Sequence, residues 1–231
     1  MDAAAVLWTG GKDSALALLE AQEAGYAVNR LVTFAPPCPD FLAHPLPVLA
    51  RQAEALGLPH HVLTVAEPHR ENYRAHIQRL RDDQGIGTLI TGDIAEVAGQ
   101  PNWIRTCCQT TGMRVFTPLW GRDRLALLKR LLALRFRVLV SCAKAPWFTA
   151  DWVGRELDEA GIAALVSVRA RTNLYLCCEE GEYHTLVLDC PLFAQELRLT
   201  ETSCHSRGDL HHLRVQGVEL VWPVDCDRIN T

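Results

Sequence analysis

The chain carries, at residues 8–14, the stretch Trp8-Thr9-Gly10-Gly11-Lys12-Asp13-Ser14. It follows a short apolar run, residues 3–8, and precedes a helical pattern over residues 13–25. Two adjacent glycines allow turn conformations that side chains would block, and they let phosphate oxygens approach main-chain N–H groups. The first turn of the helix adds unpaired N–H donors and the positive end of the helix dipole. The stretch therefore predicts a phosphate-binding loop at the end of a buried strand.

The loop is not of the Walker A type, which needs a glycine five residues before the Gly-Lys pair and a serine or threonine after it. Val6 and Asp13 fill those places. The pattern [ST]-G-G-x-D-S is instead typical of the PP-loop, which binds the pyrophosphate part of ATP. Asp13 could cap the helix, or it could hold Mg²⁺ near the phosphates directly or through water. The second interpretation is favoured, because a carboxylate beside a triphosphate needs a cation.

Strand-like runs alternate with helical patterns through the first half of the chain. The expected strands cover residues 3–8, 28–35, 61–66 and 88–91, and the expected helices cover residues 13–25, 46–56 and 70–84. Repeated units of this size predict an α/β fold with a doubly wound, mostly parallel sheet. Ligands of such sheets bind at the carboxyl ends of the strands. Gly92 and Asp93 follow one such end, and we expect them beside the glycine loop.

The second half of the chain has a different pattern. We expect helices at 122–134 and 151–160, and strands at 137–142, 174–178, 185–188 and 213–222. This pattern predicts a smaller C-terminal α+β subdomain. The expected division is an ATP-binding domain over residues 1–120 and a substrate-side subdomain over residues 121–231, packed against each other.

A second polar cluster reads Cys177-Cys178-Glu179-Glu180-Gly181-Glu182-Tyr183-His184-Thr185. It places three carboxylates, a histidine and a hydroxyl around one glycine. One interpretation is a solvated acidic hairpin turn. In the other, Glu179 and Glu182 bind a cation or the amine of an incoming nucleophile, and His184 exchanges a proton near neutral pH. Both interpretations remain open on this segment alone.

The composition limits the class of protein. The 231 residues are 48% hydrophobic, enough for a packed core, and the net charge of −4 argues against a protein that coats nucleic acid. No basic segment precedes an apolar run at the N-terminus, and no apolar run reaches the roughly 20 residues of a membrane span. We therefore expect a cytoplasmic protein without a membrane partner, with its nine cysteines as free thiols.

Together these motifs resemble the diphthine–ammonia ligase family, of diphthamide-synthase type, within the N-type ATP pyrophosphatase or PP-loop superfamily. Besides the two clusters above, the matching segments are Gly92–Ile94, Pro118–Gly121, Val153–Asp158 and Asp189–Phe193. The resemblance runs from residue 4 to about residue 193. Cys178 stands where the family has glycine, and Glu180 where it often has asparagine or glycine. A positive φ at Cys178 would cost about 1 kcal/mol or more.

The resemblance implies a sheet of the adenine nucleotide alpha hydrolase-like (HUP) type and a ligase that adenylates a carboxylate, releases pyrophosphate, and forms an amide with ammonia and AMP. The implied cofactors are ATP and Mg²⁺, with Asp13 as the metal ligand. The implied ATP-binding residues are Thr9, Gly10, Gly11, Lys12, Asp13, Ser14, Gly92 and Asp93. The implied substrate-binding residues are Glu179, Gly181, Glu182, Tyr183, His184 and Thr185. The implied catalytic residues are Lys12, Asp13, Glu179, Glu182 and His184.

The acceptor that the resemblance implies is diphthine on elongation factor 2 for an archaeal or eukaryotic chain. The arginine- and alanine-rich composition hints at a bacterial source, for which the acceptor is unknown. A homodimer is possible. Two alternatives stay open: a PP-loop enzyme that modifies tRNA, which would need a basic surface, and a module that senses ATP or AMP without turnover.

Overall fold

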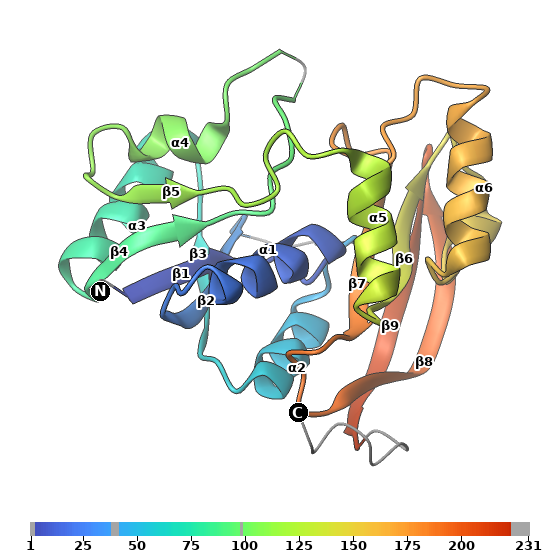
Figure 1. Ribbon diagram of the computed structural model, residues 1–231, viewed down its shortest axis with the longest axis horizontal. Helices are drawn as coiled ribbons and strands as arrows, with labels where there is room; N and C mark the ends of the chain where they lie inside the picture. The colour runs from blue at the N-terminus through green and yellow to red at the C-terminus, as the bar shows by residue number, and fades with distance from the viewer. Residues whose placement is uncertain (1–2, 38–41, 98, 223–231) are drawn as a thin grey trace.

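The computed structural model describes residues 3–37, 42–97 and 99–222, and it contains two sheets (Figure 1). The first sheet has five parallel strands in the order β3-β2-β1-β4-β5. Its strands are β1 (Ala3–Leu7), β2 (Val28–Ala35), β3 (His60–Thr64), β4 (Ile86–Ile90) and β5 (Arg114–Phe116). The strand order reverses between β1 and β4, so the ends of these two strands mark the place where an open sheet of this kind binds ligands.

Helices cover both faces of this sheet: α1 (Lys12–Glu23), α2 (Leu46–Leu56), α3 (His69–Asp82) and α4 (Trp103–Cys108). Successive side chains of a strand point to opposite faces. In β1, Ala4 and Val6 accordingly join the core cluster that contains α1 and α2, whereas Ala5 joins the cluster formed by α3 and α4. Because both faces are buried, the strand sequence is continuously apolar rather than alternating.

The second sheet is antiparallel, with strand order β7-β6-β9-β8. Its elements in chain order are α5 (Arg124–Ala133), β6 (Arg137–Lys144), the 3₁₀ turn η1 (Ala150–Trp152), α6 (Glu159–Arg169), β7 (Tyr183–Asp189), β8 (Glu196–Arg207) and β9 (Leu210–Val221). Gly208, with φ of 62°, lies in the two-residue turn between β8 and β9. These two long strands form a ribbon along the side of the molecule (Figure 1).

The two sheets share one hydrophobic core. The larger buried cluster runs from Val6 of β1 and Leu16 of α1 into Leu139 of β6 and Leu186 of β7, all with at most 7% of their surface exposed. Helix α1 contacts β7 directly. The packing therefore fixes the position of the second sheet relative to the end of β1.

The α/β fold class predicted from the sequence is confirmed. All strands and helices expected in the first half are present, with ends displaced by no more than two residues. Three elements were not predicted, namely α4, β5 and β8. Helix α4 has six residues and β5 has three, too few for a periodic signal, and most residues of β8 are exposed, so that strand lacks apolar alternation.

Two expected elements were wrong. The helix expected at 151–160 begins only at Glu159, because the Asp158 side chain caps it by accepting a hydrogen bond from Gly161 N at 2.7 Å. Gly161 does not end a helix. It lies in the first turn, where an added Cβ would sit 2.5 Å from Glu156 O. The strand expected at 174–178 is a series of turns.

None of the helices in the described part of the chain has the length and apolar character needed to cross a bilayer. No disulfide joins the cysteines in these ranges. Cys38 and Cys226 lie outside the described residues.

Candidate functional site

The glycine loop leaves the carboxyl end of β1 and is held from two sides. The carbonyl oxygen of Gly10 accepts hydrogen bonds from Gln52 Nε2 and from Val187 N, both at 2.9 Å. Gly10 has φ of 71°, and a Cβ added there would lie 2.4 Å from Gln52 Oε1. A glycine is therefore needed at this position both for its backbone conformation and for the close approach of Gln52.

Helix α1 begins at Lys12 with Gly11 at its N-cap, so Asp13 does not cap the helix. The main-chain N–H of Lys12 donates to Thr185 Oγ1 at 3.1 Å. A Cβ on Gly11 would lie 3.1 Å from Thr185 O. The loop and the start of β7 are thus in direct contact, although 173 residues separate Lys12 from Thr185.

The side chain of Lys12 is almost fully buried, with 1% of its surface exposed. Its Nζ lies 2.6 Å from Asp13 Oδ2, donates to Cys177 O at 2.9 Å, and lies 5.5 Å from the centroid of the Tyr183 ring. Burial alone would lower the pKa of Lys12, but the adjacent carboxylate of Asp13 holds this pKa well above its usual value. Lys12 is therefore a buried, permanently charged link between the glycine loop and the 177–183 segment.

Asp13 lies among groups of both signs. Burial raises the pKa of this carboxyl, the charge of Lys12 opposes the increase, and the carboxylates of Glu179 and Asp93 add to it. Within the described residues, no set of three histidine, cysteine, aspartate or glutamate side chains is placed to hold a metal ion. A cation bound at Asp13 would therefore need ligands from another source, such as phosphate oxygens and water.

Glu182 and Tyr183 build the turns that replace the expected strand at 174–178. Glu182 is 1% exposed, and its two carboxylate oxygens accept from Tyr175 N at 3.0 Å and from Glu180 N at 3.1 Å. The hydroxyl of Tyr183 donates to Leu176 O at 2.6 Å. A strand cannot form here, because these side chains take up main-chain groups that a sheet would otherwise pair.

Cys178 has φ of 62°, as expected for a position where the resembled family has glycine. Its Sγ lies 3.6 Å from Lys12 Nζ. The left-handed conformation costs about 1 kcal/mol for a residue with a Cβ. The surrounding turn and the contact with Lys12 hold the residue in this conformation.

Glu179 lies between the glycine loop and α5. One carboxylate oxygen, Oε1, pairs with Arg124 Nε, and the guanidinium of Arg124 lies 5.2 Å from the Tyr175 ring centroid. The other oxygen, Oε2, is buried and has no hydrogen-bond partner within the described residues. Only 8% of the side chain is exposed. Glu179 therefore offers an acceptor that is not yet used.

Gly92 and Asp93 lie against the start of α1. A Cβ on Gly92 would sit 2.5 Å from Asp13 C and 2.8 Å from Ser14 N, so the two main chains are in contact. Asp93 Oδ2 accepts hydrogen bonds from Thr91 Oγ1 and Asn102 Nδ2, both at 2.6 Å. The structure thus brings the glycine loop, the 92–93 segment and the 177–185 segment together.

Gln52 is a residue that the sequence analysis missed. It is fully buried, and it accepts from Trp8 Nε1 at 3.1 Å while donating to Gly10 O and, at 2.7 Å, to Val187 O. A signal was present, because Gln52 follows Val48 and Leu49 at the helical spacing that defines a buried face. A polar side chain on such a face must be hydrogen-bonded, and this one connects three elements.

Replacing Gln52 by glutamate is expected to lower the free energy of unfolding by about 2–3 kcal/mol, because a carboxylate cannot donate to the two carbonyls that the amide now serves. Thermal or urea unfolding measures this change. The exposed Gln22→Glu variant, also on a helix, is the matched control and should stay within about 0.5 kcal/mol of the parent. Equal stabilities of the two variants would contradict the structure.

His44 was also missed, and it contacts His184 of β7. The two rings meet edge to face with centroids 5.1 Å apart, and His44 hydrogen-bonds with the main chain of Thr9. Burial, together with His184, lowers the pKa of His44 from 6.5 to about 3. Burial and the charge of Lys12 lower the pKa of His184 to about 4. Both imidazoles are therefore neutral at pH 7, and each has one ring nitrogen that can accept a hydrogen bond.

The free energy of unfolding should fall as the pH is lowered from about 6.5 to about 5. The unfolded chain binds protons at both imidazoles below pH 6.5, whereas the folded chain does so only near pH 4 and below. Each histidine contributes a slope of up to about 1.4 kcal/mol per pH unit. Urea unfolding at several pH values tests this, and a His44→Gln/His184→Gln variant with an unchanged slope would refute it.

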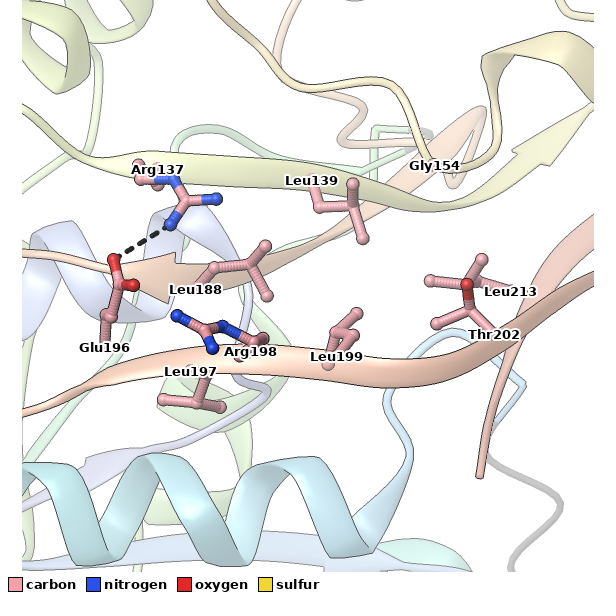
Figure 2. A pocket seen from close by; sticks show the side chains of 10 residues that line it. All are labelled: Arg137, Leu139, Gly154, Leu188, Glu196, Leu197, Arg198, Leu199, Thr202 and Leu213. Atoms are coloured by element: carbon pink, nitrogen blue, oxygen red, sulfur yellow. Dashed lines mark hydrogen bonds and ion pairs between the residues drawn. The ribbon is translucent and has the colours of Figure 1, made fainter. Parts of the chain in front are cut away.

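A separate pocket of about 340 Å³ lies in the second sheet (Figure 2). It forms where β6 and β9, paired only at Cys142–Lys144, diverge. At one end Arg137 pairs with Glu196 at 3.0 Å, and Arg137 also pairs with Glu156 at 3.0 Å. Its lining includes no residue predicted for the site, so it does not belong to the candidate site.

The chain is similar in sequence to a known protein family. Models of the diphthamide synthase N-terminal and C-terminal domains match residues 2–115 and 123–219. The diphthine–ammonia ligase of Schizosaccharomyces pombe is 26% identical to this chain over 234 residues. The match covers 91% of this chain and 38% of the yeast protein, so this chain spans about two fifths of the length of that relative. The diphthine–ammonia ligase of Danio rerio is 24% identical, covering 87% of this chain and 88% of the relative. Among solved structures, the chain is similar to a crystal structure titled predicted subunit of tRNA methyltransferase, from Methanocaldococcus jannaschii. The sequence identity is 20% and the TM-score is 0.42, and the aligned part covers 74% of this chain and 89% of the other.

Proposed function

This chain belongs to the diphthamide synthase family, and from this premise we propose that it is an ATP-dependent ligase that joins ammonia to a carboxylate-bearing acceptor. In the proposed reaction the acceptor carboxylate attacks the α-phosphorus of ATP, pyrophosphate leaves, and ammonia converts the acyl-adenylate to an amide and AMP. The observation that carries the proposal is the glycine loop at the end of β1, clamped by Gln52 and by β7.

The loop fits the pyrophosphate part of ATP. Helix α1 directs its first N–H groups toward the loop. The space beside the Cα atoms of Gly10 and Gly11 is filled by Gln52 and Thr185, so the two glycines let these residues hold the loop closely in one conformation. Thr9 Oγ1 lies 3.2 Å from Ser14 Oγ, and the buried Ser14 hydroxyl donates to Gly11 O at 3.0 Å, so these two hydroxyls hold the loop and Thr9 is the exposed one of the pair. In this arrangement Lys12 would attract the phosphates by its positive charge without touching them, because its Nζ already pairs with Asp13 and with Cys177 O.

Mg²⁺ would neutralise the phosphate charge when bound, and we assign Asp13 as its protein ligand. Mg²⁺ usually keeps several waters and takes one or two carboxylates plus substrate phosphates. The single carboxylate of Asp13, which is 29% exposed, suits this mode of binding. Asp93 is held in place by Thr91 and Asn102 on the same side, and we assign Gly92 and Asp93 to the nucleotide side of the site.

The 177–185 segment forms the second-substrate side in this proposal. His184 is a neutral acceptor at pH 7 and would orient ammonia by accepting one of its hydrogen bonds. The unused oxygen of Glu179 would hold a donor of the second substrate. Gly181, Glu182, Tyr183 and Thr185 shape this segment and position it against the loop.

These assignments place ATP binding and acceptor binding in different parts of the chain. We propose that residues 1–120 form the ATP-binding domain and that residues 121–231 form the substrate side. We further propose that the protein acts in the cytoplasm. Diphthine, which the names of the two relatives specify, is the first acceptor to test.

The test is a reaction containing ATP, Mg²⁺, ammonium and elongation factor 2 that carries diphthine. AMP and pyrophosphate should form in equal amounts and only when every component is present. With ¹⁸O in the acceptor carboxylate, one label should appear in AMP, because the carboxylate oxygen bonds to the α-phosphorus. Formation of ADP, or of unlabelled AMP alone, would rule out the adenylation route.

A further inference from the structure

A second cleft opens beside the candidate site, between the start of α2 and the β8–β9 ribbon. It has a volume of about 720 Å³ and an apolar floor that includes Pro45 and Leu46. Helix α2 packs against both strands of the ribbon (Figure 1). The lining of the cleft comes from the start of α2 and from these strands, so the cleft lies where the two sheets meet. We call it the ribbon cleft.

The wall of the ribbon cleft is basic. His205, Arg207, His212 and Arg214 line it, and among the residues that the structure describes no aspartate or glutamate lines it. The chain as a whole has a net charge of −4, so this local excess of positive charge differs from the average surface. A cleft with an apolar floor and a cationic wall complements a ligand that carries an anionic group on an apolar stem.

A row of side chains connects the ribbon cleft to the glycine loop. His205 lies opposite His212, with ring centroids 5.9 Å apart, and His212 lies opposite Cys142, which in turn lies opposite His184. Residues directly opposite on antiparallel strands share one face of the sheet. The row therefore runs across all four strands and ends at His184.

His44 completes the connection at the inner end of the ribbon cleft. It directly precedes the cleft residue Pro45, contacts His184, and hydrogen-bonds with the main chain of Thr9 in the glycine loop. Its Nδ1 is buried without a hydrogen-bond partner among the described residues. Because Cys142 is fully buried, the row itself is closed to a ligand, and His44 is the residue that separates the ribbon cleft from the start of α1.

We propose that the ribbon cleft binds the carboxylate-bearing acceptor and directs it to the glycine loop. This inference rests on the proposed function, since it names the place where the second substrate enters. Arg214 is exposed and supplies positive charge at the wall, whereas His44 lies on the inner side next to Pro45. The wall would thereby attract the acceptor by the negative charge of its carboxylate, which then moves past His44 to the glycine loop to react.

The test measures binding of diphthine-bearing elongation factor 2 to the ATP-free protein by calorimetry. Arg214→Glu should weaken this binding about 10-fold, and Arg214→Lys, which keeps the charge, should retain it. Arg171→Glu is the matched control, because Arg171 is exposed at the end of α6 and does not line the cleft, so its binding should be unchanged. ATP affinity should be the same in all variants, which also shows that they are folded.

Three results would overturn the inference: wild-type affinity in Arg214→Glu, an equal loss in Arg171→Glu, or no binding of the factor by the unaltered protein. Elongation factor 2 with an unmodified histidine serves as a second probe, and its binding should not depend on Arg214. Binding that depends on Arg214 without AMP formation would leave the ribbon cleft standing and remove the proposed function. The two proposals can therefore fail separately.

Discussion

Replacing Gly92 by alanine is expected to abolish measurable ATP binding, with a loss of affinity of about 100-fold or more. The added Cβ would sit 2.5 Å from Asp13 C, 2.6 Å from Asp13 O and 2.8 Å from Ser14 N. All three are main-chain atoms in the first turn of α1, so no flexible side chain can move aside. The first turn of α1 must shift, and its N–H groups would then no longer point at the phosphates.

Calorimetry with ATP and Mg²⁺ measures the affinity, and thermal unfolding measures the accompanying loss of about 1–3 kcal/mol in stability. Gly25→Ala is the control, because Gly25 has φ of 82° and open space around its Cα. That variant should lose about 1 kcal/mol of stability while binding ATP normally. If Gly92→Ala bound ATP as tightly as the control does, the contact between the 92–93 segment and α1 would be refuted.

Replacing Lys12 by methionine is expected to abolish AMP formation and to lower the free energy of unfolding by about 2–4 kcal/mol. The substitution removes the buried charge that pairs with Asp13 and that donates to Cys177 O. It leaves the carboxylate of Asp13 close to Glu179 without a counter-charge. Because the pKa of Lys12 is raised in the folded state, its stabilisation is fully present below pH 10.5 and is lost only as the pH rises further.

A double variant separates the structural role of Lys12 from its catalytic role. Lys12→Met/Asp13→Asn removes both charges and should recover most of the lost stability, because no unpaired ion stays buried. It should remain inactive, since both the charge of Lys12 and the proposed Mg²⁺ ligand Asp13 are absent. Unfolding curves and AMP release are measured on the same samples. Activity in the double variant would show that neither charge takes part in the reaction.

The glycine loop was predictable because its residues are contiguous and lie between a strand and a helix that the apolar pattern also predicts. The strand order at β1 and β4 then explains why Gly92 approaches α1, although the sequence alone could not give that distance. The parallel sheet was predictable for a similar reason: its strands are buried on both faces, and their composition reflects this burial.

Residues that act across the two sheets could not be placed in the same way. Gln52 in α2 and His44 in the segment before α2 both contact the glycine loop, although they lie more than 30 residues away along the chain. The expected strand at 174–178 failed because local propensity was outweighed by Glu182, whose carboxylate binds two main-chain N–H groups of the preceding turns. Such side-chain to main-chain bonds depend on burial, which a single sequence does not reveal.

The hydrogen bonds that hold the glycine loop from β7 can form only after β7 has been synthesised. A nascent chain that has exposed the first sheet on the ribosome still lacks Thr185 and Val187, which hold Lys12 N and Gly10 O from β7. If the loop binds ATP as proposed, we expect a chain that ends before β7 to bind the nucleotide more weakly than the full chain does, because these two hydrogen bonds are missing.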